Sequence, residues 1–187
     1  GEQSFLDWRK QSYPLWMADS VVHIGMSKSL STNVLHYLLL KKLSELAIAS
    51  GDPAEVSLGQ KYAGWATALK TAINEKLWDE SAGQYSIGLA TELHPAQMGR
   101  YDLLGQALVV LSDVAEGRRS PAALNNYPHH TSGAPVFWPA TPEVRIYHNR
   151  AIWPFVSAYA IKAAAHIGNA EVAGHNAMTL VHGAALH

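Results

Sequence analysis

The chain has 187 residues, a formal net charge of −1 and no cysteine. Hydrophobic residues make up 48% of the chain and charged residues 16%, a balance that argues against disorder and predicts one domain with a real core. The lack of a basic excess argues against a nucleic-acid partner, and the lack of cysteine excludes disulfides and thiolate metal sites. No run approaches the roughly 18 apolar residues of a membrane span, so we expect no membrane partner.

Most of the chain is predicted to be helical. Apolar residues recur at helical spacing over 30–50 and from 53 to about 78, and Gly51 with Asp52 and Pro53 separates the two segments. Further helices are predicted over about 99–116, 149–167 and 170 to the end, with a short one over 15–28. Residues 79–90 are typical of a turn and a short strand. The stretch 117–147, rich in Pro, His and aromatic residues, is predicted to be an ordered, functional loop without regular structure.

Two of the predicted helix ends share one pattern. Residues 49–56 read Ala-Ser-Gly-Asp-Pro-Ala-Glu-Val, and residues 166–172 read His-Ile-Gly-Asn-Ala-Glu-Val. Each is a helix end, a glycine stop, a polar cap and a new helix, which is a repeated αα-hairpin. Small residues in the later helices predict close packing of such hairpins into a ring or solenoid. Since strand signals are few, the predicted fold class is all-α.

Three segments combine aromatic and polar residues. They are Glu-Gln-Ser-Phe-Leu-Asp-Trp-Arg at 2–9, Leu-Trp-Asp-Glu-Ser-Ala-Gly-Gln-Tyr at 77–85, and Tyr-His-Asn-Arg-Ala-Ile-Trp-Pro at 147–154. Aromatic rings beside polar groups suit sugar binding, because the C–H face of a pyranose packs on a ring. The alternative is that these rings fill the gaps between helices.

The three segments resemble motifs of the six-hairpin glycosidases, which include the trehalase, glucosidase-I-like, glycogen-debranching and α-L-rhamnosidase-like enzymes. In that superfamily a hairpin helix often ends in Leu-Trp-Asp-x-x-x-Gly-x-Tyr, as at 77–85. An inner helix commonly opens with Tyr/His-Asn-x-x-x-Trp-Pro, as at 147–154, and an Asp-Trp pair often carries the general acid, as at 2–8. The resemblance covers nearly the whole chain. It implies αα-hairpins of an (α/α)6 toroid and an O-glycosyl hydrolase.

The number of predicted helices is about half of what six hairpins require. We therefore expect residues 1–187 to form a single domain that is an incomplete part of a catalytic toroid. Exposed apolar helix faces would then favour self-association or contact with the remainder of the toroid. The chain begins with Gly1 and shows no signal peptide, which leaves a periplasmic and a cytoplasmic location both open.

Glycoside hydrolysis needs an acid that protonates the leaving oxygen and a carboxylate on the other face of the sugar. The resemblance points to Asp7 as the acid, and its neighbours Phe5, Leu6 and Trp8 would raise its pKa. The alternative is a helix cap or an ion pair with Arg9. The general base is expected outside this chain or is not identified. Three other carboxylates are candidates, namely Glu92, Asp102 with helix capping as its alternative role, and the weaker Glu143.

The predicted substrate-binding residues flank the aromatic motifs and the Pro-rich loop: Trp8, Arg9, His130, Trp138, His148, Asn149, Arg150 and Trp153. An arginine fork suits sugar hydroxyls or a carboxylate, with a structural ion pair as the alternative. Asn149 has helix capping as its rival role, and Trp153 has core packing. Adjacent His129 and His130 lack further spaced ligands, so they do not predict a metal site. Neither a metal nor a cofactor is expected.

The sequence therefore predicts an inverting glycosidase that acts on a small or terminal glycoside. One alternative is a sugar isomerase or epimerase on a similar toroid, in which His129, His130 and His148 would supply acid and base. Another is a non-catalytic helical fragment that binds carbohydrate. The expected partner is a carbohydrate in each case, and the gathering of Asp, Arg and Trp at segment starts favours the enzyme.

Overall fold

The computed structural model describes residues 27–90, 95–140, 142 and 149–185. Within these residues the helices are α2 (Leu30–Ala49), α3 (Pro53–Lys76), α4 (Leu103–Leu111), α5 (Arg119–Asn125), α7 (Pro154–His166) and α8 (Ala170–Ala185). The strands are β1 (Lys28–Ser29), β2 (Trp78–Asp79), β3 (Gln84–Tyr85), β4 (Gly88–Leu89), β5 (Tyr101–Asp102) and β6 (Phe137–Trp138). The predicted all-α class is confirmed. None of the described helices has the length and apolar character needed to cross a membrane.

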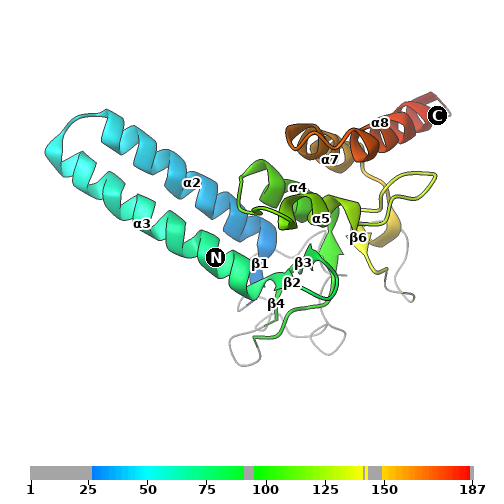
Figure 1. Ribbon diagram of the computed structural model, residues 1–187, viewed down its shortest axis with the longest axis horizontal. Helices are drawn as coiled ribbons and strands as arrows, with labels where there is room; N and C mark the ends of the chain where they lie inside the picture. Colours follow the sequence, from blue (N-terminus) through cyan, green and yellow to red (C-terminus); the bar gives the residue numbers. More distant parts are fainter. Residues whose placement is uncertain (1–26, 91–94, 141, 143–148, 186–187) are drawn as a thin grey trace.

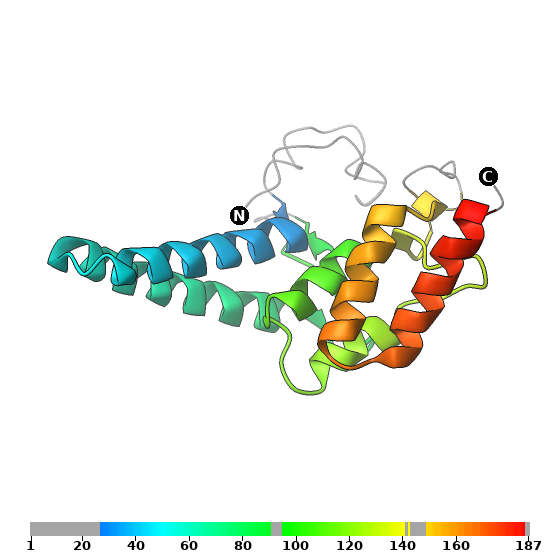
Figure 2. The same ribbon diagram turned by 90° about the horizontal axis from the view of Figure 1, so that it is seen from above.

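The described helices form three successive pairs, α2–α3, α4–α5 and α7–α8 (Figure 1). The first helices of the pairs lie in a row, with α4 packed between α2 and α7. Helix α4 is the most enclosed of them, since Leu103, Ala107 and Val109 are fully buried. The α2–α3 pair extends away from the other helices as a long arm (Figure 2).

Short antiparallel ladders lie at the starts of α2 and α4. Strand β1 leads into α2 and pairs with β4, while β5 leads into α4 and pairs with β6. The Leu103 amide donates to the Val136 carbonyl at 3.2 Å, and the Val136 amide donates to the Ala151 carbonyl at 2.9 Å. The segment that contains β6 is therefore bonded both to the start of α4 and to the residues that precede α7.

The repeated hairpin pattern is confirmed at both helix junctions. Gly51 and Gly168 adopt φ values of 74° and 70°, a left-handed conformation that glycine accepts without steric cost. The Asp52 side chain then accepts hydrogen bonds from the first amides of α3. In the same way, the Asn169 side chain accepts from the Val172 amide at 3.1 Å. A glycine stop and a polar cap thus set both turns.

The buried hydrophobic residues form two clusters. The larger one lies among α2, α3, α4, α7 and α8 and includes Leu30, Val34, Ile73, Val109 and Ala163. The smaller one lies beneath the β5–β6 ladder and the start of α7, and it consists of Ile87, Tyr101, Leu103, Tyr127, Ala134, Val136, Phe137, Val156 and Ala160. The candidate residue Trp153 packs against the smaller cluster.

Several predicted boundaries were wrong. Helix α4 covers 103–111 rather than 99–116, because β5 occupies the residues just before it. Helix α5 lies inside the stretch predicted to be irregular. Helix α7 begins at Pro154 rather than at 149, with Trp153 in the cap position, in keeping with the preference for proline in the first turn. The predicted helix at 15–28 falls mostly outside the described residues, and Lys28 belongs to β1.

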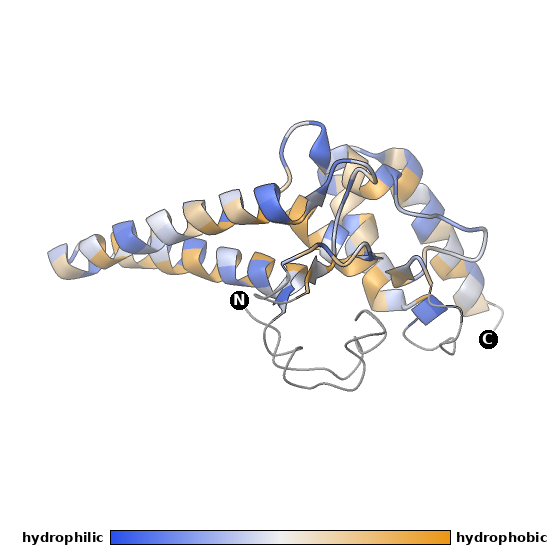
Figure 3. Ribbon diagram, turned by 90° about the horizontal axis from the view of Figure 1, so that it is seen from below, coloured by the Kyte–Doolittle hydropathy of each residue, from blue (hydrophilic) through white to orange (hydrophobic). Residues whose placement is uncertain are grey.

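The apolar residues of the arm are only partly covered. Val34 of α2 is fully buried, whereas Leu35, Leu39 and Leu46 are 54%, 54% and 59% exposed. Figure 3 shows hydrophobic residues along both helices of the arm. Helical spacing predicted α2 correctly, but it did not distinguish the packed face from the open face.

Candidate functional site

Two predicted substrate-binding residues meet on the surface beside β6. Trp138 is 38% exposed and lies opposite Tyr101 in the β5–β6 register. The ring of His130 approaches the ring of Trp138 edge-on, with 6.1 Å between the centroids and 64° between the planes. The structure therefore places a partly exposed tryptophan ring in contact with an imidazole.

Arg100 supports the same surface, although no motif marked it in the sequence. Its Nη1 donates to the Pro139 carbonyl at 2.8 Å. Its guanidinium lies 5.9 Å from the centroid of the Phe137 ring, a cation–π geometry. Arg100, which precedes β5, thus contacts the residues on both sides of Trp138, namely the ring of Phe137 and the carbonyl of Pro139.

The predicted residues before α7 differ in exposure. Arg150 is exposed, and its Nη2 donates to the Pro142 carbonyl at 3.3 Å. Asn149 is fully buried and does not occupy the cap position of α7, which corrects the alternative role considered for it. Trp153 packs against the smaller core cluster, with its ring 5.8 Å from that of Phe155. Of the two roles considered for Trp153, the structure favours core packing.

Four of the predicted site residues lie outside the described part of the chain. They are the candidate acid Asp7 and the substrate-binding candidates Trp8, Arg9 and His148. The carboxylates Glu92 and Glu143 also lie there. Asp102 is described and caps α4, since its Oδ2 accepts from the Gly105 amide at 3.0 Å and the residue is only 2% exposed. The capping role considered for Asp102 is confirmed.

His129 is engaged through both ring nitrogens. Its Nε2 lies 2.9 Å from the Leu124 carbonyl, and its Nδ1 lies 3.2 Å from the Asn176 amide nitrogen. Burial lowers the pKa of the His129 imidazole, which favours the neutral form. Both nitrogens are thus occupied by protein groups, which argues against His129 as an acid or base in the isomerase alternative. In the described residues, no three His, Cys, Asp or Glu side chains gather as a metal site would require.

The Leu-Trp-Asp motif at 77–85 forms the β2–β3 hairpin and is largely internal. The Trp78 and Tyr85 rings pack edge-on with their centroids 4.9 Å apart, and both residues are buried. The backbone of Tyr85 is bound by the side chain of Gln106, which accepts from its amide at 3.0 Å and donates to its carbonyl at 2.7 Å. The motif is therefore a packing element in this structure.

Asp79 closes that hairpin. Its Oδ1 accepts from the Ser81 hydroxyl at 2.6 Å and from the amides of Ser81 and Ala82, while its Oδ2 accepts from the Tyr101 hydroxyl at 2.7 Å. The hydrogen bond from the Ser81 side chain is the main cause that holds the pKa of Asp79 below its usual value. Asp79 thus connects the hairpin to β5, and both of its carboxylate oxygens accept hydrogen bonds from within the protein.

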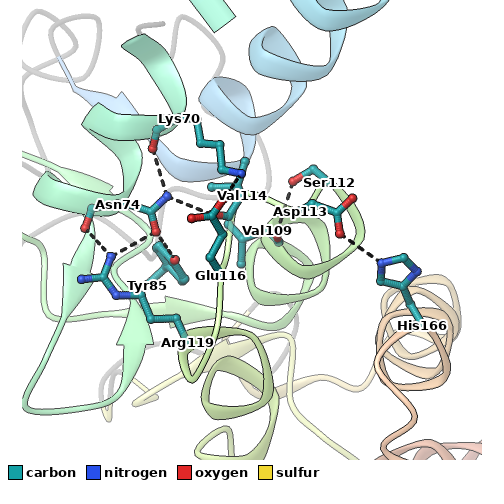
Figure 4. A network of polar contacts seen from close by, with 10 residues as sticks. All are labelled: Lys70, Asn74, Tyr85, Val109, Ser112, Asp113, Val114, Glu116, Arg119 and His166. Atoms are coloured by element: carbon teal, nitrogen blue, oxygen red, sulfur yellow. Dashed lines mark hydrogen bonds and ion pairs between the residues drawn. The ribbon is translucent and has the colours of Figure 1, made fainter. Parts of the chain in front are cut away.

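A polar network behind the hairpin joins α3 to the segment after α4 (Figure 4). The Asn74 side chain accepts from the Tyr85 hydroxyl at 2.6 Å and donates to the Lys70 and Val114 carbonyls. Arg119 donates to Asn74 at 3.1 Å, and burial raises the pKa of Tyr85 to about 12. The network borders a groove of about 980 Å³ between the arm and residues 116–119, and none of the candidate site residues that the structure describes lines that groove.

Comparison with known proteins relates the chain to parts of much longer ones. No family model matches the sequence. Over 109 residues, 56% of this chain, it is 28% identical to an N,N'-diacetylchitobiose phosphorylase from Vibrio furnissii. Its fold is similar to part of a solved sialidase, with a TM-score of 0.59 and 21% identity over 75% of this chain. The chain covers 13% of each of these proteins, and the second likeness concerns the fold alone.

Proposed function

We propose that this chain is part of the catalytic domain of a carbohydrate-processing enzyme, a glycoside hydrolase, and that its helix pairs are hairpins of an (α/α)6 toroid. The observation that carries the proposal is the partly exposed Trp138 in contact with the His130 ring, near the starts of α4 and α7. The similarity to a phosphorylase named for a disaccharide supports a carbohydrate substrate. The three successive helix pairs support the toroid.

The proposed binding surface combines an apolar face with directional donors. We assign the exposed part of the Trp138 ring to the C–H face of a pyranose, and His130 and Arg150 to its hydroxyls. The carboxylates fixed nearby, Asp79 and Asp102, are engaged in the hairpin and in the helix cap. In this proposal the surface binds and orients the sugar, and the proton transfer is assigned to a residue elsewhere.

Asp7 is proposed as the general acid that protonates the leaving oxygen. A hydrolase that inverts the anomeric centre also needs a base carboxylate at roughly 6.5–9.5 Å from the acid, with space for water between them. We place that base outside this chain. A phosphorylase is the second candidate, favoured by the similarity to the Vibrio furnissii protein. In that case inorganic phosphate takes the place of the attacking water.

The test is to titrate the chain with N,N'-diacetylchitobiose and a panel of small glycosides, and to assay cleavage by the longest polypeptide that contains it, with and without phosphate. Saturable binding with phosphate-independent release of sugar supports the hydrolase, and a sugar phosphate product supports the phosphorylase. Neither binding nor cleavage of any member would contradict a carbohydrate function. Full activity in an Asp7→Asn variant would remove Asp7 from the acid role.

A further inference from the structure

Two adjacent histidines of the loop before β6 meet two adjacent residues of α8. The Asn176 amide nitrogen lies 3.2 Å from His129 Nδ1, and His175 Nε2 lies 2.9 Å from the His130 carbonyl. The rings of His129 and His175 pack edge-on with 5.7 Å between centroids. On its other side, His129 Nε2 reaches the Leu124 carbonyl at the end of α5. The pair on α8 therefore contacts both loop histidines.

These contacts determine which ring nitrogen of His129 carries the hydrogen. A carbonyl only accepts, so the hydrogen on the His129 ring lies on Nε2 and points to Leu124. The Asn176 amide nitrogen only donates, so His129 Nδ1 accepts and the ring is neutral. A second proton on His129 would face the Asn176 donor. Rotation of the Asn176 amide would present its buried oxygen instead, but it would break the 2.9 Å bond to the Val172 carbonyl.

The contact with α8 reaches Trp138 through His130. The His130 carbonyl accepts from the Gly133 amide at 2.9 Å as well as from His175, so the turn at 130–133 is closed at the same atom that α8 binds. The ring of His130 lies against Trp138. A shift of the loop away from α8 would therefore move the imidazole that contacts the Trp138 ring.

We propose that His129, His175 and Asn176 are positioning residues that clamp residues 128–138 onto α8, hold His130 and Trp138 in their binding geometry, and release them when His129 is protonated. This inference rests on the proposed function, because the clamp orients the carbohydrate-binding surface. The titratable groups that face His129 are Tyr127 and His130 from the loop, and Glu171 and His175 from α8; α5 faces it with the Leu124 carbonyl. His130 and His175 disfavour a charge on His129, whereas Glu171 favours it.

The first experiment separates the clamp from general stability. His175→Ala removes the donor to the His130 carbonyl, His175→Gln keeps an amide donor at a similar reach, and His182→Ala is a matched control on an exposed part of α8. The readout is the indole N–H resonance of Trp138, assigned by comparison with Trp138→Phe. We expect this resonance to move in His175→Ala, to return in His175→Gln and to stay in His182→Ala. Binding of N,N'-diacetylchitobiose should weaken about 2- to 10-fold in His175→Ala alone.

The second experiment uses pH. In the unliganded chain, the Trp138 resonance should follow the titration of His129 as the pH falls below about 6.5. Asn176→Asp, which offers an acceptor to protonated Nδ1, should move that midpoint upward. A Trp138 resonance that changes neither in His175→Ala nor with the titration of His129 would contradict the proposed clamp. If Trp138 responds as expected but the wild-type chain binds no saccharide, the clamp stands and the proposed function fails.

Discussion

The β2–β3 hairpin and the surface around Trp138 contain similar residues but use them differently. Trp78 in the hairpin is 8% exposed and packs on Tyr85. The carboxylate of Asp79 and the backbone of Tyr85 are hydrogen-bonded within the protein. Trp138 is 38% exposed and its ring contacts the imidazole of His130. Burial and the number of internal partners, rather than residue type, separate this packing motif from the proposed binding surface. Substitutions in the hairpin should reduce stability, and substitutions at Trp138 should reduce binding.

The largest effect is expected at Gln106. Its side chain is fully buried and satisfies both the amide and the carbonyl of Tyr85. Gln106→Ala leaves two buried backbone groups without partners and should lower the free energy of unfolding by about 2–4 kcal/mol. Urea denaturation of this variant, beside the exposed Gln60→Ala on α3, measures the difference. Equal midpoints for the two variants would contradict an internal hairpin.

Asp79 should give a smaller, pH-dependent effect. Asp79→Asn weakens the charge-assisted bonds from Ser81 and Tyr101 and should cost about 1–2 kcal/mol at neutral pH. The pKa of Asp79 is lower in the folded state than its ordinary value of 3.8, so its contribution is present above that pH and is lost as the pH falls through the folded value. Unfolding measured at pH 7 and at successively lower pH should show the wild type and the variant converging. A constant difference across this range would argue against an ionised Asp79.

The contribution of His129 to stability should also depend on pH, with a smaller effect than that of Asp79 and in a higher pH range. Burial lowers its pKa in the folded state, so the unfolded chain binds the proton more readily. Stability should therefore be greatest above about pH 6.5 and should decline as the pH falls from there toward the folded pKa. His129→Asn removes this decline, whereas His182→Asn should retain it. Thermal unfolding across this range checks the prediction, and an unchanged slope in His129→Asn would refute it.

The smallest effect on stability is expected at Trp138. Because its ring is partly exposed, Trp138→Ala should change the free energy of unfolding by less than about 1 kcal/mol. If Trp138 binds sugar as proposed, the same substitution should abolish measurable binding of N,N'-diacetylchitobiose, since the proposed stacking ring is lost. Calorimetric titration and denaturation of one preparation give both values. A large loss of stability would indicate that Trp138 is a packing residue like Trp78.

The sequence was informative where local chemistry determines structure. Apolar spacing with a glycine stop and a polar cap located α3 and α8 at Gly51–Asp52 and Gly168–Asn169. Helix α5 was missed because it is short, carries no side-chain cap and contains Pro121. The open face of α2 was not predictable, because periodicity alone does not reveal which apolar side is covered.

The roles of individual candidate residues depended on distant partners. Asp79 accepts a hydrogen bond from Tyr101, 22 residues away, and His129 is hydrogen-bonded to Asn176, 47 residues away. No local pattern contains either contact. His130 and Trp138 were predicted from their place in the Pro-rich loop, and their contact depends on the fold of that loop, which is bonded to α4 and α8. Asp7 remains a prediction from the resemblance.

The most direct test of the account is an NMR titration of the chain with N,N'-diacetylchitobiose, comparing the wild type with Trp138→Ala. We predict saturable shifts that are largest at the Trp138 indole and its neighbours, small at Trp78, and absent in Trp138→Ala. Shifts centred on the hairpin or on the groove beside Lys70, or shifts that persist in Trp138→Ala, would contradict the assignment of this surface as the carbohydrate-binding site.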